Sequence, residues 1–491
     1  MSDQTARAEI SFRFRGRNVA LKDFPPDRML LDWLREEAGA KGTKEGCAEG
    51  DCGACTVVLR RPRGGALTCE PVNACILLLG QIDGAELLTV EDLAQGESLH
   101  PVQQAMVDFH GSQCGFCTPG IVMSLFAHYH EHGVAATRES VNAALAGNLC
   151  RCTGYRPIVE AALSVIDGRP NDRFDEDEPE RVAALEALPR GDLFVGDESG
   201  FFAAPATEGS LVALYEAHPD AVLLGGATDV GLWVTKRLMR LAKIIWLGRI
   251  AAFDAILSDG DCVRFGAGAS LQAAAGNLAS IHPDLGLLLS RFGSMQVRVS
   301  GTVGGNIANG SPIGDLAPAL IALGGQVELR KGGVSRELAL EDFFLAYGKQ
   351  DRRLSEYVRA LQVPRLKAHQ AYRAYKVSKR FDEDISAVMG AFRLELDGRR
   401  ISAARVAYGG MAAVPKRAAA CEAALMGVSL DDPATWEAAK VAISTDFTPL
   451  SDMRASAAYR LTVATQLLTR ALTEISGAAV PTRLGELRAA E

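Results

Sequence analysis

The cysteines of this 491-residue chain gather toward one end, and this asymmetry constrains its organisation more than any other feature of the sequence. Nine of the eleven lie before residue 153, and only Cys262 and Cys421 follow. In a reducing compartment, clustered cysteines indicate metal or redox chemistry more often than disulfides. The sequence therefore predicts two functional halves, the first of them built around metal.

Charge and hydropathy narrow the class of protein further. The chain has 52 basic and 60 acidic residues, a net charge of −8, which argues against nucleic acid as a partner. Residues 1–4 lack the basic start of a secretory signal, and no stretch reaches the roughly 18 apolar residues of a membrane span. We therefore expect a soluble cytoplasmic protein that binds neither nucleic acid nor membrane.

The first cysteine constellation has the spacing C-x4-C-x2-C followed by a distant fourth cysteine, as in plant-type [2Fe–2S] proteins. Glycines in the loop allow positive φ angles and a tight turn that directs backbone N–H groups at the sulfurs. Structural zinc is the alternative, although zinc sites usually pair two short knuckles. Cys69 also lies near, and we interpret it as a small buried apolar residue. The predicted ligands are Cys47, Cys52, Cys55 and Cys75, and the glycines are Gly46, Gly50 and Gly53.

The second constellation combines a C-x2-C pair with a C-x-C pair, which by itself fits zinc as well as iron–sulfur. Thr118-Pro119 predicts a helix start with a capping Thr and Pro at the first helical position, and Pro157 opens another helix. The pairs thus lie near helix N-termini, which favour an anionic cluster. The predicted ligands are Cys114, Cys117, Cys150 and Cys152.

These motifs resemble a known family. The segments QCGFCTPGIVMS (113–124) and GNLCRCTGYRPI (147–158) are similar to the helical [2Fe–2S] domain of the xanthine dehydrogenase and aldehyde oxidase family of molybdenum hydroxylases. EGCAEGDCGACTV (45–57), with Asn73-Ala74-Cys75, resembles the plant-type domain of the same family. The resemblance implies iron rather than zinc at both sites and selects Cys75 over Cys69. It also implies that Gln113 lies beside the pterin of the molybdenum cofactor.

The second half contains two glycine-rich stretches, 223–230 and 300–306, which match neither G-x-G-x-x-G nor the P-loop. Singly each stretch fits an ordinary turn. As a pair they resemble the FAD domain of the same family, of the vanillyl-alcohol-oxidase type, in which they hold the diphosphate and ribityl chain. The implied FAD-binding residues are Leu223, Leu224, Gly225, Gly226, Ala227, Thr228, Asp229, Val230, Ser300, Gly301, Thr302, Val303, Gly304, Gly305, Asn306, the carboxylate Asp315, Phe292 and Val358 beside the adenine, and Lys376 near the flavin. The charged segment 378–386 resembles a loop that influences whether NAD⁺ reaches the flavin.

The expected fold class is multidomain α+β. Alternation predicts a hairpin over 10–22, and apolar runs predict strands at 222–224, 244–247, 263–266 and 387–396. The predicted domains are a β-grasp ferredoxin-like [2Fe–2S] domain (1–87), a four-helix [2Fe–2S] domain (88–167), an exposed Pro-, Asp- and Glu-rich linker (168–197), an FAD-binding domain (198–367) and a C-terminal flavoprotein domain (368–480).

The resemblance implies an electron relay within a xanthine dehydrogenase. A larger molybdopterin-binding subunit, in a dimer of heterodimers, would oxidise hypoxanthine and xanthine to urate, so no catalytic residue for that step is expected here. Electrons would pass through the second and then the first cluster to FAD and on to NAD⁺.

Two alternatives stay open. One is the same relay in an aldehyde oxidase or another molybdenum hydroxylase with an acceptor other than NAD⁺. The other is a redox-inert scaffold pinned by zinc. No joint metal site of His128, His130 and His132 is expected, because they alternate along a predicted helix and point to diverging faces.

Overall fold

The computed structural model describes residues 6–131, 135–166 and 169–483, so the N-terminal residues 1–4 and His132 lie outside it. The chain forms two compact units. The first unit comprises Met1–Asp254, Ser270–Gln272 and Gly293–Thr302, and the second comprises Ala255–Ala269, Ala273–Phe292 and Val303–Glu491. Among the described residues, no helix combines the length and the apolar character that a membrane crossing requires.

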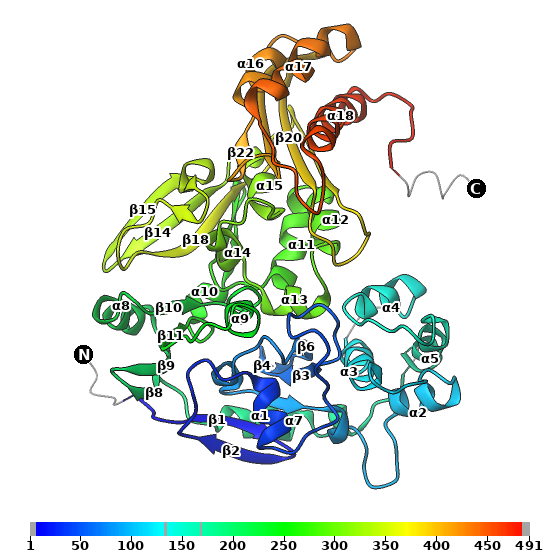
Figure 1. The fold of residues 1–491 in the computed structure, drawn as a ribbon, viewed down its shortest axis with the longest axis vertical. Helices are drawn as coiled ribbons and strands as arrows, with labels where there is room; N and C mark the ends of the chain where they lie inside the picture. The colour runs from blue at the N-terminus through cyan, green and yellow to red at the C-terminus, as the bar shows by residue number, and fades with distance from the viewer. Residues whose placement is uncertain (1–5, 132–134, 167–168, 484–491) are drawn as a thin grey trace. The chain divides into compact units, whose positions relative to one another are not determined.

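The first unit opens with a mixed sheet in the order β2-β1-β7-β3-β6, drawn in blue in Figure 1. The predicted hairpin is confirmed, because β1 and β2 pair antiparallel from Ile10–Leu21 to Phe14–Arg17. Helix α1 covers the sheet and buries Trp33, whose ring meets Phe12 edge-on at 5.3 Å. The elements are β1 (Ile10–Phe14), β2 (Arg17–Leu21), α1 (Leu30–Glu36), β3 (Thr56–Arg60), β6 (Glu70–Asn73) and β7 (Glu86–Leu88), with a small hairpin of β4 (Pro62–Arg63) and β5 (Ala66–Leu67).

A helical domain follows, in cyan in Figure 1. It consists of α2 (Pro101–Asp108), α3 (Thr118–Tyr129), α4 (Arg138–Leu145) and α5 (Arg156–Ile166). The predicted helix start at Thr118-Pro119 is confirmed, but the predicted Thr118 cap is wrong. Cys117 occupies the N-cap position, and the hydroxyl of Thr118 bonds instead to that of Ser112 at 2.7 Å.

The segment expected to be an exposed linker is partly folded onto the first unit. It contains α6 (Arg173–Glu176) and α7 (Glu178–Glu186), and Phe174 is only 1% exposed within the core of the helical domain. Arg181 pairs with the buried Glu86 of β7 at 2.5 Å. Phe174, the buried Leu185 and Leu188 and a few ion pairs therefore anchor a stretch whose composition is otherwise that of a linker.

The first unit also contains a second sheet, in the order β10-β11-β9-β8. Its core is continuous with that of the ferredoxin-like domain, since Leu224, Ile244 and Phe202 belong to the same buried cluster as Ile10 and Leu30. The elements are β8 (Leu193–Asp197), β9 (Gly200–Ala204), α8 (Glu208–Ala217), β10 (Val222–Leu224), α9 (Val230–Thr235), β11 (Lys243–Trp246), α10 (Ala251–Asp254) and α13 (Met295–Ser300).

The second unit is built on an antiparallel sheet in the order β12-β13-β18-β14-β15 and another in the order β19-β20-β21-β22. Helix α15 contacts strands of both sheets, and every one of its residues is buried. The elements are β12 (Ile256–Ser258), β13 (Cys262–Gly266), α11 (Leu271–Ile281), α12 (Pro283–Ser290), α14 (Val303–Asn309), α15 (Leu316–Leu323), β14 (Gln326–Lys331), β15 (Val334–Ala339), β16 (Phe344–Ala346), β17 (Lys349–Gln350) and β18 (Tyr357–Pro364).

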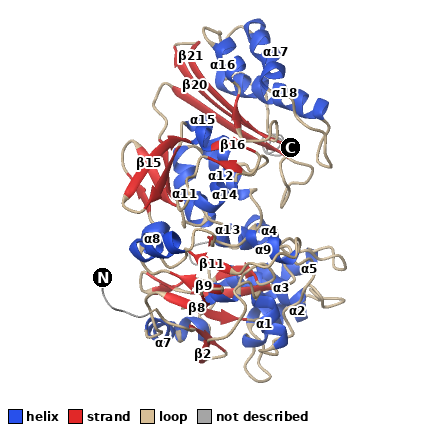
Figure 2. Ribbon diagram, turned by 60° about the vertical axis from the view of Figure 1, so that its left-hand side comes forward, coloured by secondary structure: helices blue, strands red, loops and turns tan. Residues whose placement is uncertain are grey.

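The last part of the chain packs helices on its own sheet, as Figure 2 shows for α16, α17 and α18 beside β20 and β21. Their shared core includes Phe392, Tyr408 and Leu468. The elements are β19 (Gln370–Val377), β20 (Val388–Asp397), β21 (Arg400–Gly409), β22 (Lys416–Arg417), α16 (Ala419–Leu425), α17 (Glu437–Asp446) and α18 (Ala457–Ser476).

Candidate functional site

The structure brings together the four cysteines of the first predicted tetrad. The thiol of Cys47 contacts those of Cys52 and Cys75, and Cys75 also contacts Cys55. These contacts, together with burial, raise the pKa of Cys75, because neighbouring thiolates repel one another. A bound cation would remove that repulsion, and metal binding releases the thiol protons. The four thiols therefore lie close enough to one another to act as one set of ligands.

The loop around the first tetrad, which we call the first cysteine loop (45–55), directs backbone donors at sulfur. The N–H groups of Glu49 and Cys52 each donate to Cys47 Sγ at 3.4 Å. Gly50 and Gly53 have φ angles of +79° and +67°, as expected, whereas Gly46 has no positive φ. Gly46 is needed for space, because a Cβ there would lie 2.7 Å from Cys52 Sγ.

The second tetrad lies on two segments, 113–118 and 147–152, which we call the second cysteine segments. Cys114 contacts Cys152, and Cys117 contacts Cys150. Burial, reinforced by the Cys150 thiol, raises the pKa of Cys117 to about 12. Cys114 and Cys152 are exposed. The thiols are therefore paired across the two segments, as two irons that each take two thiolates require.

Across the part of the chain that the structure describes, the one group of three or more potential ligand atoms that lie within 4.8 Å of one another is His100, His130 and Asp172. The preference for iron over zinc at the two cysteine tetrads rests instead on the spacing of the cysteines along the chain.

The two tetrads lie on loops that touch. A Cβ on Gly53 would overlap the carbonyl oxygen of Gly147, and one on Gly120 would overlap that of Gly53. The N–H of Leu149 donates to Cys52 O at 2.9 Å. The contact between the first cysteine loop and the second cysteine segments is therefore backbone against backbone.

The two glycine-rich stretches of the flavin half, 223–230 and 300–306, contact each other within the first unit. That unit includes the second stretch only as far as residue 302. A Cβ on Gly226 would overlap the Ser300 carbonyl, and one on Gly225 would lie 2.8 Å from Thr302 Oγ1. Residues 223–224 end β10, 225–229 form the turn, and α9 begins at Val230. Ala227 is buried with a φ of +64°, which a residue other than glycine rarely adopts. The expected pairing of the two stretches is present between 225–226 and 300–302.

Helix α9 also joins the glycine turn to the first cysteine loop. A Cβ on Gly231 would overlap Ile76 O, next to the predicted ligand Cys75. Lys236 Nζ donates to Cys47 O at 2.5 Å and pairs with Glu49 at 3.2 Å. The helix that follows the turn expected at the FAD diphosphate therefore contacts the first cysteine loop.

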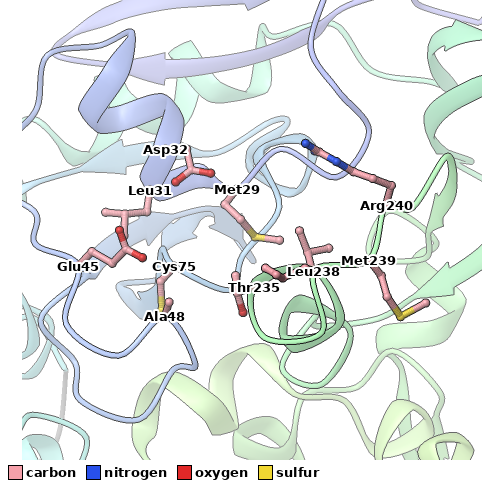
Figure 3. Close-up of a pocket in the computed structure, with 11 residues that line it drawn as sticks. Met29, Leu31, Asp32, Glu45, Ala48, Cys75, Thr235, Leu238, Met239 and Arg240 are labelled. Atoms are coloured by element: carbon pink, nitrogen blue, oxygen red, sulfur yellow. The ribbon is translucent and has the colours of Figure 1, made fainter.

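A cavity of about 300 Å³ opens between these elements in the first unit. Figure 3 shows Cys75 and Ala48 on one side, with Thr235 and Leu238, from the end of α9 and the residues after it, on the other. Burial raises the pKa of Asp32 in its wall. The cavity gives solvent a route toward the Cys75 side of the first tetrad.

In the second unit, Val303–Asn306 form the first turn of α14, so this part of the stretch is helix rather than loop. Asp315 and Lys376, expected at FAD, form an ion pair at 2.7 Å with both side chains only 4% exposed. The hydroxyl of Ser386 also donates to Asp315. Sequence reasoning placed Ser386 in the charged segment 378–386 but did not pair it with Asp315.

The remaining residues predicted to bind FAD or the pterin lie on different elements of the fold. Phe292 is half-buried directly after α12, Val358 is buried in β18 opposite Leu329, and Gln113 is exposed. Arg291, which the sequence did not single out, donates to Lys376 O and Ser378 Oγ at 3.2 Å each and stacks on Phe381. It anchors the start of the charged segment.

The compact His100, His130 and Asp172 group was also missed, because its members are far apart in sequence. His100 Nδ1 accepts from the Val102 N–H, so its Nε2 carries the hydrogen that meets Asp172 at 2.7 Å. That ring nitrogen is unavailable to a metal. His128 instead contacts Glu131 and Ser140, in line with the expected divergence from His130.

Four family models match the chain in this domain order. They are a 2Fe-2S iron-sulfur cluster binding domain (15–78), a [2Fe-2S] binding domain (89–163), an FAD binding domain in molybdopterin dehydrogenase (198–366) and a CO dehydrogenase flavoprotein C-terminal domain (373–475). The chain is therefore a [2Fe–2S] and FAD chain of the molybdenum hydroxylase family.

Within that family, its curated relatives include xanthine dehydrogenases. That of Emericella nidulans is 32% identical over 89% of this chain, and the xanthine dehydrogenase/oxidase of Rattus norvegicus is 30% identical over 82%. The chain spans 36% and 34% of the length of these relatives. A chain of the Cu,Mo-CO dehydrogenase is 26% identical with a TM-score of 0.53, covering 57% of this chain and 98% of that one. A chain of the Hydrogenophaga pseudoflava carbon monoxide dehydrogenase is 26% identical with a TM-score of 0.53, covering 58% and 96%.

Proposed function

We propose that this chain is the electron-transfer subunit of a NAD⁺-dependent xanthine dehydrogenase. When bound, the [2Fe–2S] clusters and FAD pass single electrons from a molybdenum site and deliver them in pairs to NAD⁺, as hypoxanthine and xanthine become urate. The observation that supports this most is the direct contact between the backbone segments that carry the two cysteine tetrads, and between the first of them and helix α9, which follows the glycine turn.

Different residues of the chain would hold the different cofactors. Cys114, Cys117, Cys150 and Cys152 would hold the cluster that faces molybdenum, and Cys47, Cys52, Cys55 and Cys75 the next one. The amide groups of Gly225, Gly226 and Gly301 would hold the FAD diphosphate, because backbone N–H groups of such turns can bind phosphate oxygens. Asp315 and Lys376 would bind the flavin part as a preformed ion pair.

A molybdopterin-binding partner subunit would meet the chain at the second tetrad. Cys114, Cys152 and Gln113 are exposed, and Phe116 and Leu149 beside them are each 48% exposed. Exposed apolar residues around a redox site favour a protein partner. We place Gln113 at the pterin and keep the dimer of heterodimers as the expected assembly.

The segment 378–386 would control access of NAD⁺ to the flavin. Arg291, Lys379 and Arg380 bring positive charge there, and Phe381 is 65% exposed. A dinucleotide presents phosphates and flat rings, which arginine and an exposed aromatic ring can bind.

The test is to purify the chain with its native partners and measure NADH formation on addition of xanthine. Xanthine-dependent NADH formation is the expected result. Turnover of aldehydes but not purines, or transfer only to acceptors other than NAD⁺, would favour the aldehyde oxidase alternative. A colourless protein containing zinc and no acid-labile sulfide would favour the scaffold.

A further inference from the structure

Gln296 is buried where three parts of the first unit meet. It lies on α13, and its side chain is 1% exposed. Its Nε2 lies 3.2 Å from Thr56 Oγ1, 3.1 Å from Ser124 Oγ and 3.1 Å from Asn148 Oδ1. These partners belong to β3, to α3 and to the second cysteine segments. One amide group therefore joins the ferredoxin-like domain, the helical domain and a segment that the FAD-binding model matches.

The hydrogens of this network are fully assigned by its geometry. The Thr56 hydroxyl donates to Gly53 O at 2.7 Å, and the Ser124 hydroxyl donates to Asn148 Oδ1 at 2.6 Å. Each hydroxyl has one hydrogen, so both oxygens can only accept from Gln296. Its amide N–H₂ thus faces three acceptors, and an oxygen or a methyl group in that position would leave them without this donor.

The same partners adjoin both tetrads. Thr56 directly follows Cys55, and Asn148 precedes Cys150 by two positions. Asn148 Nδ2 also donates to Gly53 O at 3.2 Å. The network therefore ties the backbone of the first cysteine loop to that of the second cysteine segments at their contact.

The position of Gln296 is held at a cost. Its Oε1 is buried, finds no hydrogen-bond partner among the residues that the structure describes, and faces Gly147, where a Cβ would overlap it. An unsatisfied buried acceptor lowers the stability of the folded state. A methionine of similar length would fill the space without that cost, so the donor function of the amide is what this site uses.

Helix α13 continues from this junction to the glycine turn. Ser300, at its end, is the residue whose carbonyl a Cβ on Gly226 would overlap. With a rise of about 1.5 Å per residue, the helix separates Gln296 from Ser300 by only about 6 Å. One short helix thus contacts both the junction of the tetrads and the turn expected at the FAD diphosphate.

We propose that Gln296 is a positioning residue for electron transfer: its amide fixes the spacing between the two cysteine loops and fastens them to the helix that ends at the FAD turn. The inference rests on the proposed function, because it needs clusters at both tetrads. It assigns no contact between Gln296 and a cofactor.

The test uses the full chain with its native partners and the variant Gln296→Met, which keeps side-chain length and removes the donor. Iron and acid-labile sulfide are first measured on the wild type. Both clusters are then reduced with dithionite, and their magnetic interaction is read as line splitting in the EPR spectrum. Gln103→Met is the matched control, because its amide bonds only to Val90 O and the His100 N–H in the helical domain.

We expect Gln296→Met to retain its iron but to lose the splitting, while Gln103→Met keeps it. Unchanged splitting in an iron-replete Gln296→Met protein would overturn the inference and leave the proposed function standing. If this variant does not fold, Ser124→Ala, which removes one acceptor, decides by the same criterion. An iron-free wild type would refute the proposed function and the inference together.

Discussion

At the scale of single residues, Cys69 and Cys75 show how surroundings decide the role of a thiol. Cys75 lies among other cysteine thiols. Cys69 lies apart from them, and burial raises its pKa to about 12. The raised pKa is shared by the predicted ligands Cys75 and Cys117, so the difference lies in the neighbouring thiols, which Cys69 lacks.

The Cys75→Ala variant should therefore lose the first cluster and half of its iron, whereas Cys69→Ala should retain all of it. Iron and sulfide analysis of the two purified variants, with visible spectra, is the measurement. Equal iron loss in both variants would contradict the assignment of ligands.

The Asp315 and Lys376 pair allows a second prediction. Both side chains are buried, so Lys376→Met would leave the Asp315 carboxylate without its cation. Breaking a buried pair costs about 3–5 kcal/mol, and we expect that loss in urea unfolding followed by hydrogen exchange of β19 and β20. The control is the double variant Asp315→Asn with Lys376→Met, which should lose less. A single variant as stable as the wild type would disprove this account of the pair.

At the scale of elements, segments with an apolar sequence pattern could be predicted, whereas segments held in place by tertiary contacts could not. The strands Val222–Leu224 and Val388–Asp397 match apolar runs, and the first five residues of the second strand are all buried. Helices α6 and α7 were missed because their largely polar composition is that of a linker, and the burial of their anchors Phe174 and Leu185 depends on tertiary contacts. The cysteine spacing predicted both tetrads, but the packing of α13 on them depends on tertiary contacts that no local pattern records.

The anchoring of α6 is predicted to depend on pH. Burial lowers the pKa of His100, so the folded state holds its ring neutral and the unfolded state binds the extra proton. Burial alone would raise the pKa of Asp172, but hydrogen bonds from His100 and His130 outweigh it and hold that pKa well below its usual range. Stability should therefore fall as the pH drops below about 6.5, and again as Asp172 becomes protonated under strongly acidic conditions.

Hydrogen exchange of α3 and α6 between pH 8 and pH 5 measures this effect. The His100→Asn variant keeps an N-cap acceptor for α2 and removes the titrating ring, so its step near pH 6.5 should disappear. Asp172→Asn should lower the stability of this region by about 1–3 kcal/mol at neutral pH, because it removes a charged acceptor. A pH profile identical in His100→Asn and wild type would contradict the assignment.

At the scale of the whole molecule, domain order along the sequence and compact units in space do not coincide. The region matched by the FAD-binding model contributes residues 198–254, 270–272 and 293–302 to the first unit and the remainder to the second. The sequence predicted the order of cofactor domains, since each has local motifs. It could not predict this division, which depends on contacts between distant segments.

Assembly with a partner provides the prediction at this scale. Phe116 is exposed beside the second tetrad, so Phe116→Glu should prevent copurification with the molybdopterin-binding subunit and leave the iron content unchanged. Leu238→Glu is the control, because Leu238 is 80% exposed and lies at the cavity beside the first tetrad instead. Normal assembly of the Phe116→Glu variant would show that the partner subunit binds at another surface.

The contact between Gly53, Gly120 and Gly147 affects how precisely the distance between the segments that carry the two tetrads is defined. Because main chain meets main chain, the distance across it depends little on most of the surrounding side chains. The exceptions are Asn148 and Gln296, whose amide groups hydrogen-bond at this contact. The gap that an electron would cross is thus defined by the backbone and one amide network, so substitutions in that network are the ones that should change it.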